Sequence, residues 1–164
     1  MPDTLQTLVR GLDAALTVPR EAFPAAVTAA LGQAVASGSW LGPDQLRVDP
    51  EQYARHLLYA DPLERYTVVS LVWSNGQQSP IHSHHTWCGV AVYRGEICET
   101  FYSAENGKPA PLRTVRRKAG TLSFDEGDAG VHRIANSDGD VAVSIHVYGI
   151  AAAQVTTGVN RVLG

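Results

Sequence analysis

The sequence predicts a mostly β protein, an antiparallel sandwich or barrel with α-helices at its N-terminus. Two observations predict it. Apolar residues in positions 1–40 recur at helical spacing, and from Tyr66 onward short β-rich runs alternate with turn signals. The length of 164 residues fits one domain over 1–164.

Two helices are expected within 1–40. In the first, apolar residues recur every three or four positions, which gives the helix one apolar face until Pro19 interrupts the pattern. The second is an Ala-rich run from Phe23 to Ala36. It ends near Gly38, where a helix stop is expected.

The segment from Asp49 to Leu58 fits two structures. Asp49 followed by Pro50 is a helix-start signal. The order Tyr-x-Arg-x-Leu ahead of Asp61 fits a strand that enters a turn equally well. The local pattern leaves both structures open.

Strands are expected in seven β-rich runs further along the chain. These runs are Tyr66–Trp73, Trp87–Tyr93, Glu96–Tyr102, Leu112–Arg116, Thr121–Phe124, His132–Ala135 and Val141–Tyr148. The turn signals between them are Asn75-Gly76, Arg94-Gly95, Asn106-Gly107, Ala119-Gly120, Glu126-Gly127-Asp128 and Asp138-Gly139-Asp140. The segment 150–164 is small and polar, and no element is assigned to it.

Composition argues against several classes of partner. The formal net charge of −3 gives no general case for binding nucleic acid or an anionic membrane, since both need a basic face. The sequence contains no run of about 18 apolar residues, the length that could span a bilayer. Asp3 and Asp13 interrupt any secretion signal. Cys88 and Cys98 then fit a reducing compartment better than a disulfide scaffold. We expect a cytoplasmic monomer.

Two histidines are the first candidates for a metal site. In extended structure, residues two apart point to the same side, so His82 and His84 project together while His85 faces away. Neutral imidazoles on one face can chelate iron, zinc, copper or nickel. A bare His-x-His is weak evidence, because such a cluster also occurs on solvated surfaces.

The surroundings of these histidines resemble the two motifs of the cupin superfamily. Gly76 lies six residues before His82, and a second glycine-rich stretch continues through His132 to Asn136. The resemblance implies a small cupin domain, a double-stranded β-helix or jelly-roll barrel. It also implies a metal held by His82, His84 and His132.

The sequence departs from the cupin motifs where a glutamate ligand is expected, because Cys88 stands there. The second motif has Glu126 in place of its proline, and its histidine falls one residue late. Three neutral imidazoles leave a divalent metal its full charge and open positions for a substrate thiolate and an oxygen-derived ligand. Cys88 could instead be a fourth ligand that closes a structural zinc site. Both readings remain open.

The run Val141–Tyr148 alternates strictly. Ser144, His146 and Tyr148 share one face, and valines and an isoleucine occupy the other. An ordinary half-buried strand has this pattern, with its polar face toward water. In a small barrel the inward face can line a cavity while the apolar face packs under helices. His146 could then orient the Tyr148 phenol toward the metal.

Taken together, these motifs resemble the thiol dioxygenases, the cysteine dioxygenase type I family in particular, over roughly Tyr53 to Gly149. The resemblance implies helices in 1–40, a barrel with the metal site in 53–149 and a C-terminal tail in 150–164. It implies Fe(II) as cofactor, held by the three histidines. The implied catalytic residues are Ser144, His146, Tyr148 and Cys88, with a thioether between Cys88 and Tyr148 in some members.

The same resemblance implies that Tyr53 and Arg55 lie on a strand and face the cavity as substrate-binding residues with Tyr148. Arginine at this position is typical of the cysteine-oxidising members, and its planar fork suits a carboxylate. On a helix, Arg55 would instead form an exposed pair with Glu51. The remaining candidates are interpreted as structural: Cys98 as a buried small hydrophobe, His56 as facing away from Arg55, and Trp73 as core or cavity wall.

The expected activity is the addition of both atoms of O2 to the sulfur of a small thiol, with L-cysteine giving cysteine sulfinate. One alternative is another thiol, 3-mercaptopropionate or mercaptosuccinate. An alternative from a different class is a non-catalytic cupin, either a small-ligand sensor or a structural zinc module with Cys88 as ligand.

Overall fold

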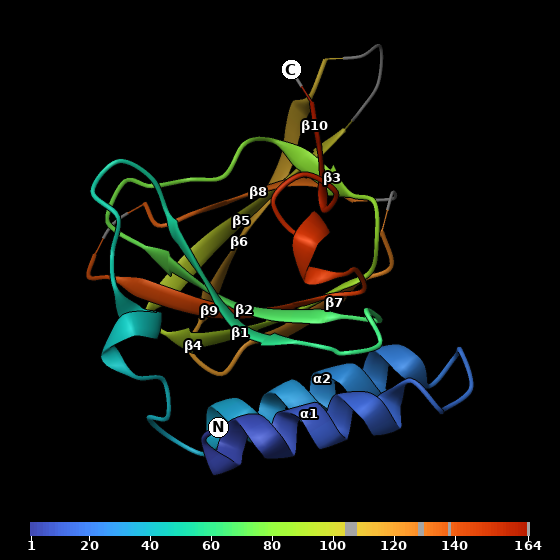
Figure 1. Ribbon diagram of the computed structural model, residues 1–164. Coiled ribbons are helices and arrows are strands. Elements are labelled where there is room, and N and C mark those ends of the chain that lie inside the picture. The colour runs from blue at the N-terminus through green and yellow to red at the C-terminus, as the bar shows by residue number, and fades with distance from the viewer. Residues whose placement is uncertain (104–107, 128–129, 138, 164) are drawn as a thin grey trace.

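The computed structural model describes residues 1–103, 108–127, 130–137 and 139–163 (Figure 1). The predicted turn residues Asn106, Gly107, Asp128 and Asp138 lie outside these ranges. Two helices, α1 (Asp3–Ala15) and α2 (Phe23–Ala36), precede the strands. The strands are β1 (Ala54–Ala60), β2 (Thr67–Trp73), β3 (His82–His84), β4 (Cys88–Arg94), β5 (Glu96–Ser103), β6 (Ala110–Lys118), β7 (Leu122–Asp125), β8 (Val131–Ala135), β9 (Ala142–Tyr148) and β10 (Asn160–Val162).

The strands form two antiparallel sheets, which confirms the mostly β architecture. One sheet has the order β1-β2-β9-β4-β7 and the other has the order β10-β3-β8-β5-β6. Figure 1 shows the first sheet between the two helices and the second sheet. Each sheet combines strands from both halves of the chain, so the two histidine stretches meet in the second sheet.

The helices cover the outer face of the first sheet. Leu8 and Leu12 of α1 are buried and share one core cluster with Ile145 of β9. Close approach of α2 to β4 requires glycine at position 89, because a Cβ there would lie 2.7 Å from Val27 Cγ1. Both predicted helices are confirmed, and the apolar face of β9 packs beneath them as expected.

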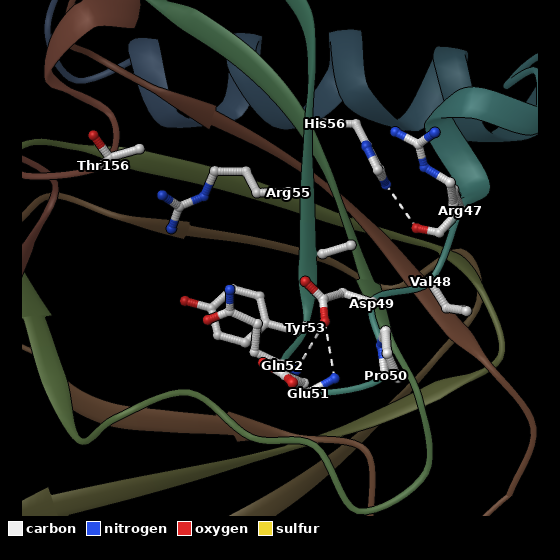
Figure 2. A pocket seen from close by; sticks show the side chains of 11 residues that line it. Arg47, Val48, Asp49, Pro50, Glu51, Gln52, Tyr53, Arg55, His56 and Thr156 are labelled. Atoms are coloured by element: carbon white, nitrogen blue, oxygen red, sulfur yellow. Dashed lines mark hydrogen bonds between the residues drawn. The ribbon is translucent and has the colours of Figure 1, made fainter.

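From Ala54 onward the ambiguous segment is the strand β1, and Tyr53, which was expected on the strand, lies directly before it. Residues of β1 pair with β2 in antiparallel register, with Arg55 opposite Leu71. This pairing is a contact between segments some distance apart in the chain, so the local pattern could not decide between helix and strand. The strand places the Arg55 and His56 side chains on opposite sides of β1, as Figure 2 shows.

The structure corrects two expectations. The segment after Gly149 is part of the barrel, because β10 pairs with β3 and both Val155 and Val159 are buried in the core. Cys98 is half-buried rather than buried. It alternates on β5 with the buried Ile97, and therefore points away from the face that packs between the sheets.

Neither α1 nor α2, nor any other helix in the described part of the chain, has the length and apolarity needed to cross a bilayer.

Candidate metal centre

Three buried imidazoles converge between the sheets. His82 and His132 are direct partners across the β3–β8 pair, and His84 lies two residues further along β3 on the same face. One ligand atom from each ring lies within 4.8 Å of the others. The strand pairing thus brings together residues fifty positions apart (132 − 82).

Hydrogen bonds determine which nitrogen of each ring is free. His82 Nδ1 lies 2.9 Å from the carbonyl oxygen of Pro80, and His132 Nδ1 lies 2.7 Å from Glu99 Oε1. Because a carbonyl or carboxylate oxygen only accepts, each Nδ1 carries the proton and donates it. The lone pair then resides on Nε2, and His132 Nε2 is buried with no hydrogen-bond partner.

His84 follows the same arrangement. Its Nδ1 lies 3.3 Å from Asp125 Oδ2, so Nε2 is again the nitrogen left for a ligand. Burial, with a smaller contribution from the nearby His132, lowers the pKa of His82 to about 3. His82 is therefore neutral at physiological pH, which is the form that binds metals. His85 is exposed and faces away, as expected.

The donor set fits a divalent transition metal. It consists of three neutral imidazole nitrogens with outer partners that orient the rings. The group found among the described residues contains no sulfur. Cys88 Sγ instead lies 3.8 Å from His146 Nδ1, and burial raises the pKa of its thiol. Cys88 sits directly opposite Tyr148 across the β4–β9 pair.

A chain of hydrogen bonds runs along the inward face of β9. Trp73 Nε1 lies 3.0 Å from Ser144 Oγ, Ser144 Oγ lies 2.9 Å from His146 Nε2, and His146 Nδ1 lies 3.1 Å from the Tyr148 hydroxyl. The indole N–H can only donate, so Ser144 Oγ accepts it, and the Ser144 hydroxyl proton is left available for His146 Nε2. Burial lowers the pKa of His146, which keeps this ring neutral.

The tautomer of His146 sets the direction of these hydrogen bonds. When Ser144 donates to Nε2, the single proton of neutral His146 is on Nδ1 and is donated to the Tyr148 oxygen, and the Tyr148 hydroxyl proton is then free to point into the cavity. Burial raises the pKa of Tyr148, so the phenol keeps its proton. Trp73, interpreted from the sequence as core or cavity wall, also holds the Ser144 end of this hydrogen-bond series.

A small cavity of about 10 Å³ lies between the histidines and β1. Its lining includes Tyr53, Arg55, Tyr148, His82 and His84. Tyr53 stacks on Trp73 of β2, with ring centroids 4.4 Å apart. Tyr53 and Arg55 therefore face the metal-ligand cluster, where the resemblance placed them.

Arg55 also borders the solvent side. It lines a pocket of about 700 Å³ outside β1, together with Arg47, Asp49, Tyr53, His56 and Thr156. In Figure 2, Arg55 and Tyr53 point to one side of β1, while His56 points to the other side and contacts the carbonyl oxygen of Arg47 at 2.7 Å. Arg55 thus lines both the outer pocket and the cavity beside the histidines.

The Arg55 guanidinium has spare donors. Its Nη1 donates to the carbonyl oxygen of Val155 at 3.2 Å, and its Nε is buried without a partner. Val155 belongs to the segment that the sequence analysis left unassigned. That segment positions the arginine.

Sequence reasoning missed the two carboxylates that contact the histidines. On β5, Glu99 lies two residues from each of the apolar residues Ile97 and Phe101 and therefore shares their inward face, which is a readable signal of a buried acid. Asp125 ends β7, and its partner His84 is forty-one residues away in the chain. No local pattern connects that pair.

Comparison with known proteins agrees with this geometry. A family model described as cysteine dioxygenase type I matches residues 16–157. A conserved Klebsiella pneumoniae protein with a double-stranded β-helix domain is 20% identical, over 71% of this chain and 87% of its own, with a TM-score of 0.52.

Two other solved structures share the fold. A cupin superfamily protein from Desulfitobacterium hafniense is 11% identical, over 69% of this chain and 93% of its own, with a TM-score of 0.52. Peruvianin-I from Thevetia peruviana latex, described as a cysteine peptidase, is 15% identical, over 76% and 80%, with a TM-score of 0.51. At these identities the likeness shows the cupin fold alone.

Proposed function

Because the chain belongs to the cysteine dioxygenase type I family, we propose that it is a mononuclear Fe(II) thiol dioxygenase whose substrate is L-cysteine. The observation that supports this most directly is the convergence of His82, His84 and His132 beside a cavity that also contains Arg55. A ferrous ion bound there would supply open coordination positions and the redox chemistry that joins a thiol sulfur to dioxygen.

Arg55 selects the substrate by its carboxylate. Its fixed charge and planar fork suit bidentate binding of a carboxylate group. The Val155 carbonyl oxygen holds one of its nitrogens, so the guanidinium is oriented before the substrate arrives. Holding the carboxylate there places the thiol end of an amino acid of this size toward the histidines.

Tyr148 supplies a hydrogen-bond donor to the bound substrate or its oxidised sulfur. In the proposed tautomer His146 carries its proton on Nδ1 and donates it to the phenol oxygen, so the phenol proton is free to point into the cavity. Ser144, which accepts the Trp73 N–H, donates to His146 Nε2 in that tautomer. These four residues, from Trp73 to Tyr148, hold the phenol proton in position and do not need to transfer it.

The reaction balances without another cofactor. The O–O bond of dioxygen and the S–H bond of the thiol break, two S–O bonds form, and the proton is released when the sulfinic acid ionises to the sulfinate. The sulfur is oxidised, and its electrons reduce both atoms of dioxygen. The product of L-cysteine is cysteine sulfinate.

Oxygen uptake by Fe(II)-reconstituted protein tests the proposal. We expect uptake with L-cysteine, matched by sulfinate formation, and lower specificity for 3-mercaptopropionate and mercaptosuccinate. Uptake with 3-mercaptopropionate but not with cysteine would refute the assignment of substrate. Stoichiometric zinc in the purified protein, with no uptake for any thiol after iron loading, would refute the assignment of function in favour of a structural cupin.

A further inference from the structure

Glu99 and Asp125, which contact the metal-ligand histidines, line a second cavity. This cavity, of about 340 Å³, is lined by both carboxylates together with His84 and His132, while Arg55 lines the other one. The histidines thus stand between these two carboxylates, one of which is paired with Arg117, and Arg55 on the other side. The carboxylates take no part in the reaction as described so far.

Glu99 is held on both of its oxygens. Oε1 accepts the His132 Nδ1 proton at 2.7 Å, and Oε2 accepts the Arg117 Nε proton at 2.5 Å. Arg117 comes from β6, which pairs with β5, so the sheet itself sets this geometry. Two N–H donors, one of them from a cationic guanidinium, thus hold Glu99 as a buried carboxylate.

Asp125 is held in a similar way. Oδ1 accepts the backbone N–H of Gly127 at 2.8 Å, which leaves Oδ2 to face His84 at 3.3 Å. Glycine at position 130 makes room for the carboxylate, because a Cβ there would lie 3.1 Å from Oδ2. Gly130 of the second motif thus lets the Asp125 carboxylate keep this position without a shift.

We propose that Glu99, held by Arg117, and Asp125 are positioning residues. Each accepts a hydrogen bond from a metal-ligand histidine and so places negative charge next to a ligand set that is itself neutral. The inference rests on the proposed function only in requiring that the three histidines hold a divalent metal. A carboxylate that accepts the Nδ1 proton orients the ring and makes Nε2 a stronger donor to the metal. In this chain the carboxylate that cupins place among the ligands is replaced by two carboxylates behind them.

Metal affinity without substrate is the test. Removal of such an outer partner typically costs about 10–100-fold in affinity, so Glu99→Gln should bind Fe(II) about 10–100-fold more weakly than wild type. Affinity is measured anaerobically, by competition with a colorimetric chelator. The matched control is Glu96→Gln, since Glu96 lies on the same strand and pairs with an arginine of β6 but contacts no histidine. Its affinity should equal that of wild type.

Asp125→Asn is the second variant. It is isosteric and its side chain is 24% exposed, so it tests the proposal even where Glu99→Gln proves unstable. Its longer contact predicts a smaller loss of affinity than Glu99→Gln. Wild-type affinity in both variants, or an equal loss in Glu96→Gln, would overturn the inference.

The outcome is separable from that for the proposed function. Because neither thiol nor oxygen is present, a protein that binds Fe(II) through these carboxylates but oxidises no thiol would refute the function and leave the inference standing. If the protein oxidises cysteine while Glu99→Gln and Asp125→Asn keep full affinity for Fe(II), the function would stand and the inference would be refuted.

Discussion

Replacement of Arg55 by glutamine tests how the substrate is selected. Gln keeps a polar side chain but removes the charge and the planar fork. A hydrogen bond to a charged group contributes about 1.5–3 kcal/mol. Since about 1.4 kcal/mol is tenfold in affinity, Arg55→Gln should raise the KM for L-cysteine by about 10–150-fold.

Cysteamine makes this prediction specific to the carboxylate. It has the thiol and amine of cysteine but no carboxylate, so its own slower oxidation should be the same in wild type and Arg55→Gln. His56→Gln is the control variant, because His56 is on the same strand and faces the other side. Steady-state oxygen uptake measures all of these. An equal loss for cysteine and cysteamine would mean that Arg55 supports the fold through Val155 and does not bind the carboxylate.

Three further predictions concern covalent chemistry and stability. Turnover with iron and cysteine should allow a thioether between Cys88 and Tyr148, which face each other across β4 and β9; intact-mass measurement should show the loss of two hydrogens in wild type and none in Cys88→Ser. Hydrogen bonds from an arginine side chain lower the pKa of Asp61 from its usual 3.8 to about 2, so its contribution to stability is present above pH 3.8 and is lost as the pH falls toward 2. The difference in melting temperature between wild type and Asp61→Asn should shrink over that range, and a constant difference would contradict this. Leu31 is 0% exposed, so Leu31→Ala should cost about 2–5 kcal/mol in denaturant unfolding, while Leu63→Ala, at a 72% exposed position, should cost under about 0.5 kcal/mol.

Strand alternation made much of the site readable from the sequence. His82 and His84 are two residues apart, as are Ser144, His146 and Tyr148, and a strand places each set on one face. Both predictions need only local strand geometry, and in the structure the side chains of both sets face inward. His132 needed the family resemblance, because its meeting with His82 depends on the pairing of two distant strands.

The remaining features depend on contacts that local sequence does not encode. The local pattern did not distinguish the strand from Ala54 from a helix; the family resemblance implied a strand, and the pairing with β2 confirms it. The last strand, β10, is three residues long and is stabilised by pairing with β3 rather than by its own propensity. Glu99 could have been identified from the sequence, since an acid on the same buried strand face as Ile97 requires a partner. Its partner, His132, lies thirty-three residues away.

Isotopic labelling of the product tests the central claim most directly. Iron-loaded protein is supplied with L-cysteine and oxygen-18 gas in ordinary water, and the product is examined by mass spectrometry. We expect cysteine sulfinate in which both oxygen atoms of the sulfinate group are labelled. Sulfinate that carries oxygen from water, or cystine as the sole product, would contradict it.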